Sequence, residues 1–381
     1  MVILLLRSVR LSGAHTTFSS LSVTQTLKSL FQSHLTFRAG YSTSAALEDA
    51  CISVVVLLPS LNSISFQMRG NGIRWAVLER CFQLCHLATL TFEQPGGFTG
   101  IDPYPFKDLA TIARSLKKLS YAAYEWRDLP RRDTPYRVLM EYPDEIALEK
   151  KCMAALVLGI HLTLESLCIP WETAPLMEMS HSSWPRLQQL SLRGLYRSRE
   201  ELVPLRQLVV ALSSNLSDLC VEICPTKKLG GRLHLFEKQG PGRPDSHPLL
   251  LPQLRSLVLA YPDPGDFIFD AVGTQLTHLS ISDFPRFYYH RSSDHVKGTR
   301  AAPILLSSEC LTILKRMSLR HLTRLALVYI WDEAEDDLLA HITQGDSIPQ
   351  LSHLELHRHR QSRYDIVPHV CTPALILLLL R

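Results

Sequence analysis

The fold of this chain can be predicted from a pattern that is clearest in Trp184-Pro-Arg-Leu-Gln-Gln-Leu-Ser-Leu-Arg-Gly-Leu195. Leu187, Leu190 and Leu192 follow the spacing L-x-x-L-x-L. Side chains two residues apart in an extended strand point to the same face, so Leu190 and Leu192 mark one apolar side of a strand. A single strand cannot bury such a side alone, and the spacing therefore predicts that the same phrase recurs along the chain.

The phrase recurs nine more times between residues 61 and 351, with a further candidate at Leu6, Val9 and Leu11. Most of the steps between copies are 22 to 29 residues, and the two longest, 46 and 48, are close to two units. Such periods are typical of leucine-rich repeats. The copies are Leu61/Ile64/Phe66, Leu87/Leu90/Phe92, Leu116/Leu119/Tyr121, Leu164/Leu167/Ile169, Leu216/Leu219/Val221, Leu254/Leu257/Leu259, Leu276/Leu279/Ile281, Leu322/Leu325/Leu327 and Leu351/Leu354/Leu356.

Apolar residues between the phrases recur with helical spacing, and each such stripe predicts one helix face. The sequence therefore predicts an α/β leucine-rich-repeat solenoid of about ten irregular repeats, with parallel strands on the concave face and helices on the convex face. The alternative is another leucine-rich α/β protein in which the phrase matches by chance. The stripes are Trp75/Leu78/Phe82/Cys85, Phe106/Leu109/Ile112/Ala113/Leu116 and Leu202/Leu205/Val209/Leu212.

On these phrases, residues 55–360 resemble the irregular leucine-rich-repeat region of fungal F-box-type proteins. Leucine-rich-repeat families place Asn or Cys three residues after the last leucine, and only Cys224 fits that pattern here. Pro143–Glu149 resembles the opening of an F-box, but Lys150 and Lys151 stand where its helix should become apolar. We therefore expect a convex-face helix there, and no F-box is recognisable: either the protein lacks one or the chain is incomplete.

Three segments are expected along the chain. Residues 1–47 are either a first repeat or a mitochondrial targeting segment, because they contain no Asp or Glu and four basic residues. Residues 48–369 form the solenoid, and 370–381 form an apolar tail. Within the solenoid, the Gly-, Pro- and Lys-rich residues 225–250 predict a long mobile excursion, and the acidic run Asp332–Asp337 predicts a helix start.

The composition favours no nucleic acid or membrane partner, because the net charge of +4 is small and both signs are interspersed. Nine scattered cysteines suggest reduced thiols and a cytoplasmic or nuclear protein, with the mitochondrion as the alternative. We expect no catalytic, cofactor or metal site. Gly345-Asp346-Ser347 is better explained as a helix end than as a nucleophile motif, and Cys81 and Cys85 as core thiols.

The expected function is that of a protein–protein interaction scaffold, and the alternatives are a mitochondrial protein or an enzyme with an unrecognised site. The resemblance implies substrate recognition in a ubiquitin-ligase adaptor, with a Skp-type partner if a longer form carries an F-box. Residues between and beside the phrase leucines should face away from the core on the concave side, where a protein partner would bind, among them Ser65 and Val328. The predicted protein-binding residues are Gln189, Arg193, His278, Arg324, Glu355 and His357.

Overall fold

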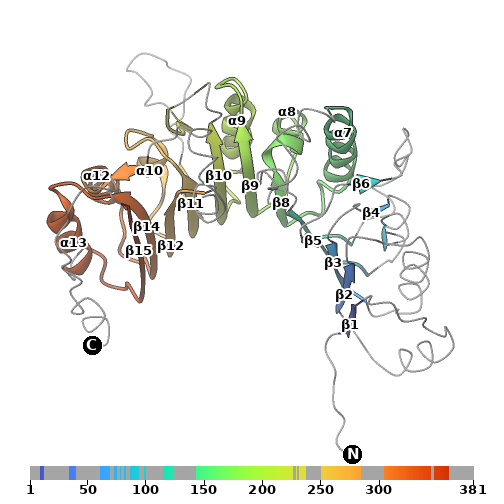
Figure 1. Ribbon diagram of the computed structural model, residues 1–381, viewed down its shortest axis with the longest axis horizontal. Coiled ribbons are helices and arrows are strands. Elements are labelled where there is room, and N and C mark those ends of the chain that lie inside the picture. The colour runs from blue at the N-terminus through green and yellow to red at the C-terminus, as the bar shows by residue number, and fades with distance from the viewer. Residues whose placement is uncertain are drawn as a thin grey trace, which may run out of the picture. The chain divides into compact units, whose positions relative to one another are not determined.

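A computed structural model, whose helices and strands are labelled in Figure 1, divides the chain into two compact units. The first unit consists of Met1–Leu195 and Val203–Asn215, and the second of Tyr196–Leu202 and Leu216–Arg381. The structure describes residues 9–12, 34–39, 61–68, 73–74, 78, 81–82, 86–93, 98–99, 115–122, 143–225, 229, 231–236, 250–284, 304–344 and 347–359.

The first unit contains a sheet in which every pair of neighbouring strands is parallel. Its strands, in spatial order, are β1 (Val9–Ser12), β2 (His34–Ala39), β3 (Ser63–Met68), β5 (Thr89–Glu93), β7 (Lys118–Ala122), β8 (Ser166–Pro170) and β9 (Gln189–Tyr196). A separate parallel pair joins β4 (Ile73–Arg74) and β6 (Phe98–Thr99). The helices are α7 (Pro143–Gly159), the 3-10 helix η1 (Trp171–Thr173), α8 (Leu176–Ser180) and α9 (Leu202–Leu212).

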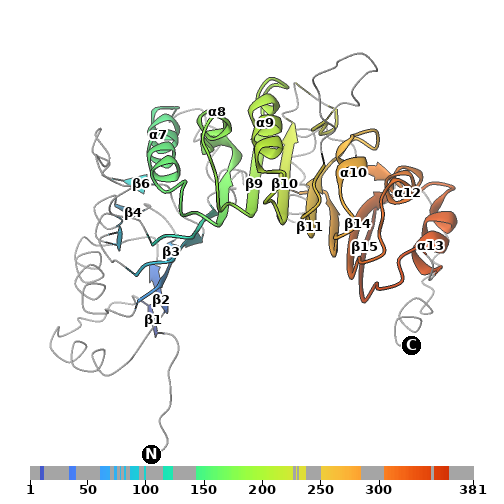
Figure 2. The same ribbon diagram turned by 180° about the vertical axis from the view of Figure 1, so that it is seen from behind.

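The second unit repeats this plan with parallel strands and short helices. Its strands run in the order β10 (Asp218–Pro225), β11 (Ser256–Ala260), β12 (His278–Ser282), β14 (Arg324–Ile330) and β15 (His353–His359). The two-residue strand β13 (Leu305–Leu306) pairs with the end of β14. The helices are α10 (Ile268–Ala271), α12 (Ser307–Arg316) and α13 (Glu335–Thr343), and in both views α12 and α13 lie on one side of β14 and β15 (Figures 1 and 2).

The strand positions confirm the α/β class and the parallel strands. Each of the ten predicted phrases overlaps one strand, and Val9 and Leu11 of the further candidate lie in β1. The predicted stripe from Leu202 to Leu212 is helix α9, and the segment from Pro143 is helix α7. Of the stripe that begins at Trp75, Leu78 and Phe82 are buried, whereas Trp75, Cys85 and the stripe of 106–113 lie outside the described residues.

Side chains alternate between the two faces of the strands in the second unit. The phrase residues of β11, β12 and β14 are at most 1% exposed, and the apolar side of α12, which carries Cys310, Ile313 and Leu314, is buried as well. The residues between them, such as Ser256 and His278, are only half-buried. The leucines therefore build the core against the helices, and the intervening residues form the other face of the sheet.

Hydrogen bonds at the start of the strands recur from one strand to the next. In each case one carbonyl accepts two successive N–H groups of the following strand: Thr277 N and His278 N donate to Arg255 O, and Thr323 N and Arg324 N donate to Thr277 O. The carbonyls in these positions belong to Asn62, Ala88, Lys117 and Glu165 in the first unit and to Ser217, Arg255, Thr277 and Thr323 in the second. These hydrogen bonds hold neighbouring strands in a common register.

One prediction was wrong for part of its range. Residues 231–236, expected to belong to a mobile excursion, form a segment that packs into the second unit, and we call Gly231–Phe236 the strap. Leu233 and Leu235 are at most 1% exposed, and Leu233 pairs with Pro262 in a β-bridge. Burial of these apolar side chains outweighs the flexibility that the neighbouring glycines and prolines suggest.

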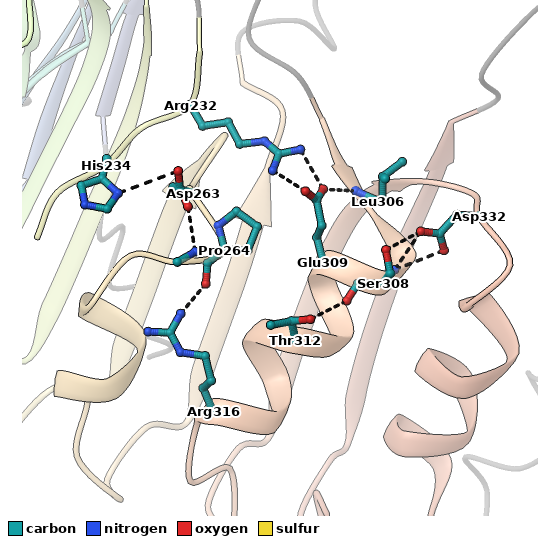
Figure 3. A network of polar contacts seen from close by, with 11 residues as sticks. Arg232, His234, Asp263, Pro264, Leu306, Ser308, Glu309, Thr312, Arg316 and Asp332 are labelled. Atoms are coloured by element: carbon teal, nitrogen blue, oxygen red, sulfur yellow. Dashed lines mark hydrogen bonds and ion pairs between the residues drawn. The ribbon is translucent and has the colours of Figure 1, made fainter. Parts of the chain in front are cut away.

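The acidic run before α13 has a second role that the sequence did not predict. Glu335, Asp336 and Asp337 lie in the first turn of α13, as expected. Asp332, however, accepts hydrogen bonds from the backbone and hydroxyl groups of Ser308, at the start of α12 (Figure 3). It also accepts one from Ala334 N. Asp332, just before α13, therefore connects that helix start to the start of α12 through Ser308, 24 residues earlier in the sequence.

Two further features bear on the sequence expectations: the end of α13 and the length of the apolar helices. Helix α13 ends at Thr343 with Gln344 as its C-terminal boundary, and Gly345 lies outside the described residues. Across the part of the chain that the structure describes, no helix is long and apolar enough to cross a bilayer.

Candidate protein-binding face

One row of polar side chains crosses the exposed face of the second unit's sheet. Backbone register places His278 beside Ser256 on one side and beside Arg324 on the other, and Arg324 beside His353. Asp218 is in register with Ser256 at the far end. We call Asp218, Ser256, His278, Arg324 and His353 the polar row. Neighbouring strands lie about 4.8 Å apart, so these side chains follow one another closely across the sheet.

His278 stands in the middle of this row. Burial lowers the pKa of His278, the positive charge of Arg324 lowers it further, and Asp218 acts in the opposite direction. Ser256 Oγ and His278 Nδ1 lie 3.0 Å apart, which is a hydrogen-bond distance. An ordinary histidine pKa is about 6.5, so a lowered value leaves the imidazole of His278 neutral at pH 7.

Arg324 is the exposed cation of the row. Its side chain makes no hydrogen bond or ion pair with any residue of the described ranges, and His353 beside it is likewise exposed and unpaired there. Its backbone N–H, in contrast, is held by Thr277 O at 3.0 Å. A firmly held backbone therefore presents a guanidinium group whose five donors point away from the core.

Glu355 and His357 lie on β15 and face the same side, because they are two residues apart. His357 Nε2 and Glu355 Oε1 are 2.6 Å apart, so the carboxylate of Glu355 is engaged on its own strand. In register, Glu355 lies beside Ala326 and His357 beside Val328. The structure thus brings four of the six predicted binding residues onto one face of the second unit.

The other two predicted residues, Gln189 and Arg193, lie on β9 of the first unit and do not belong to the polar row. Gln189 is exposed and in register with Ser166, whereas Arg193 is only half-exposed, in register with Pro170, and its Nε atom is buried. Arg193 is therefore a less accessible anchor than Arg324.

Next to Arg193, Gly194 has a backbone that other residues rarely adopt. Its φ is +143°, and a Cβ atom there would lie 2.4 Å from Oε2 of Glu172. The same carboxylate accepts the N–H of Leu195 through Oε1 at 2.8 Å. Gly194 thus lets Glu172 approach the end of β9.

We expect Gly194→Ala to lower the free energy of unfolding of the first unit by about 1–3 kcal/mol, because it combines a strained φ with displacement of Glu172. Thermal unfolding of the full chain should show a Tm several degrees lower than that of the parent. Ser191→Ala, at a half-buried position of the same strand, is the control and should change the Tm little. Equal melting of the Gly194 variant and the parent would contradict this assignment.

Two residues expected to face outward are buried. Ser65 is 5% exposed, between Thr36 and Thr91 of the neighbouring strands in register, and Val328 is 9% exposed, beside His357. The spacing of the phrase alone could not predict their burial. Conversely, the sequence did not single out Asp218 and Ser256 as members of the polar row. Each comes directly before the second apolar residue of its phrase, as His278 and Arg324 do in theirs.

Charged side chains also hold the strap, away from the predicted binding residues. Arg232 forms two hydrogen bonds with Glu309, at 2.5 and 2.7 Å, and Glu309 also accepts the N–H of Leu306 at the start of α12 (Figure 3). Asp266, which is 1% exposed, accepts N–H groups of Leu235 and Phe236. Sequence reasoning missed these contacts. The alternation of Leu233 and Leu235 with Arg232 and His234 was a usable signal for the burial of the strap, but not for its pairing with Glu309.

Of the candidate groups weighed from the sequence, Cys81 is 1% exposed and lies in the core, whereas Cys85, Gly345 and Asp346 lie outside the described residues. Among the described residues, no group of three or more His, Cys, Asp or Glu side chains is arranged to hold a metal ion, and the six cysteines there are free thiols. Burial raises the pKa of the Cys310 thiol to about 12 and that of Cys152 to about 11. Both thiols are therefore protonated at neutral pH and behave as apolar core groups.

Comparison with known proteins does not assign the face to a family. The chain matches no protein-family model and none of the curated proteins.

Proposed function

We propose that the chain is a protein-interaction module and that the polar row and its neighbours Glu355 and His357 bind the partner. The observation that carries this proposal is Arg324, an exposed guanidinium group without a partner among the described residues, on a rigid parallel strand. Arginine is enriched among the residues that dominate binding energy at protein interfaces.

We further propose that the chain is a leucine-rich-repeat solenoid, an architecture that supports a role in protein binding. Phrases of L-x-x-L-x-L coincide with the strands, and the same paired hydrogen bonds recur at the strand starts within each unit. Solenoids of this kind use the exposed face of their parallel strands to bind other proteins. In such a solenoid the polar row belongs to the concave face and α12 and α13 to the convex face.

From the resemblance to fungal F-box-type proteins, we propose more specifically that the chain recognises substrates as part of a ubiquitin-ligase adaptor. In this form the polar row takes the substrate, and a Skp-type subunit joins through an F-box carried by a longer form of the protein. Cytoplasm and nucleus are the compartments in which such an adaptor acts.

Affinity capture tests both the protein-binding role of the polar row and the proposed adaptor role. A tagged longer gene product should recover a Skp-type subunit, and the tagged chain should recover a substrate protein that the Arg324→Ala variant recovers poorly. Arg320→Ala is the matched control, because Arg320 is an exposed arginine outside the strands of the same unit. Turnover of a substrate in an unbiased hydrolase or transferase screen, together with equal capture by all three proteins, would contradict the proposal.

A further inference from the structure

The polar row concentrates nitrogen-bearing side chains around Arg324. His278 and His353 flank it in register on the two neighbouring parallel strands. With strands about 4.8 Å apart, the three side chains span roughly 10 Å. One or two acidic side chains of an extended peptide fit within that width.

The acidic groups of this face do not pair with Arg324. Glu222, on the same side of β10 as Asp218, accepts a hydrogen bond from Ser282. Asp218 is at the opposite end of the row, with β11 between its strand and that of His278. Glu355 faces the same side as Arg324, but its carboxylate pairs with His357 at 2.6 Å. No carboxylate of the described ranges pairs with Arg324, so the β14 end of the row has positive charge without an internal counter-ion.

We propose that the partner segment docking on the polar row is acidic, and that one of its Asp or Glu carboxylates forms a paired hydrogen bond with the guanidinium of Arg324, between His278 and His353. This inference rests on the protein-binding function proposed above. A guanidinium fork matches a carboxylate in two parallel N–H···O bonds, a geometry that lysine cannot offer. The next side chains along the strands, Ser280 and Ala326, are short, so an extended segment can come close to the sheet.

The affinity of the polar row for a carboxylate should depend on pH, through the protonation of His278. In the free protein the pKa of His278 is lowered by burial, by the charge of Arg324 and by His353, against the attraction of Asp218. An anion between the two residues offsets that repulsion and favours the protonated imidazole, so binding takes up a proton. The affinity is therefore highest below the pKa of the free imidazole and falls as the pH rises through the higher pKa of the complex.

The test measures binding of short fluorescent peptides to the full chain by fluorescence anisotropy. The probes are a peptide of alternating Glu and Ser, a peptide of alternating Lys and Ser, and a neutral Gly-Ser peptide of the same length. The Glu peptide should bind the parent most tightly, and more tightly at about pH 6 than at about pH 8. Arg324→Ala should weaken its binding at least tenfold, which corresponds to about 1.4 kcal/mol, whereas Arg320→Ala should bind like the parent.

Two further variants make the test specific. Arg324→Lys keeps the charge without the fork and should bind between the parent and Arg324→Ala, which keeps the inference testable if the alanine variant does not fold. His278→Gln should reduce the pH dependence while the Tm stays close to that of the parent. Each variant is compared by thermal unfolding before binding is measured.

Several results would overturn the inference: equal affinity of Arg324→Ala and the parent, no preference of the parent for the Glu peptide over the neutral one, or binding to phosphatidylserine vesicles but not to the Glu peptide. If the Glu peptide does not bind while capture of a protein partner still depends on Arg324, the inference that the partner segment is acidic is wrong and the proposed function stands. If the Glu peptide binds as expected but no partner is captured, the preference of the row stands and the proposed function fails.

Discussion

Replacing Asp266 by alanine is expected to lower the free energy of unfolding of the second unit by about 3 kcal/mol or more. The buried Asp266 carboxylate accepts three backbone N–H groups, from Leu235 at 2.5 Å and from Phe236 and Ile268 at 3.0 Å. Alanine leaves these donors without their acceptor, and each unpaired buried donor costs about 1–3 kcal/mol. The strap, which Asp266 holds by two of these bonds, should detach first.

Denaturant unfolding of the full chain, followed by hydrogen exchange at Leu235 and Phe236, measures this effect. Asp263→Ala is the matched control: Asp263 lies three residues earlier, its side chain is 43% exposed, and its Oδ1 accepts one backbone N–H, from Gly265. Its Oδ2 also lies 3.8 Å from His234 of the strap, so the control removes one solvent-accessible strap contact but none of the buried hydrogen bonds. The control should cost about 1 kcal/mol or less. Equal stability of the Asp266 variant and the control would show that the strap is not held in this way.

Leu279→Ala is expected to destabilise the second unit by about 2–5 kcal/mol, because Leu279 is fully buried in the middle of the sheet and its removal leaves a cavity. Ser280→Ala, at the next position of the same strand, should change stability by about 0.5 kcal/mol or less, because Ser280 is half-buried on the other face. Alanine substitutions at two neighbouring residues of one strand should thus lower the free energy of unfolding by amounts that differ severalfold.

Both variants are compared with the parent by thermal and denaturant unfolding. A similar loss in the two would mean that β12 does not separate a core face from a free face, and the polar row would lose its structural basis. A loss confined to Leu279→Ala supports the two-sided sheet on which the proposed function depends.

The sequence predicted the strands well because their signal is local. Each phrase places two apolar residues on one side of a short strand, and the buried pairs Leu257/Leu259 and Leu279/Ile281 follow that rule. Strand β2 was missed because Gln32 stands where the phrase requires its first leucine, although Leu35 and Phe37 fit the rest. Strand β13 has only two residues, too few for any periodic signal.

The site could be predicted only in part, because its remaining features depend on long-range contacts. Alternation along β12 and β14 was enough to place His278 and Arg324 on the free face. The neighbours of each residue in the row require the strand register, which backbone hydrogen bonds set between distant segments. The strap depends on contacts such as Arg232 with Glu309, 77 residues apart, and no local pattern predicts such a pair.

Histidine labelling with diethylpyrocarbonate, with and without the captured partner, tests most directly whether the polar row is the binding face. His353 and His357 report on that face, and His321, exposed before β14, is the internal control. The account predicts that the partner protects His353 and His357 while His321 remains fully reactive. Unchanged labelling of His353 and His357 in a complex that protects His341 on α13 would contradict it, because the partner would then lie on the helical side.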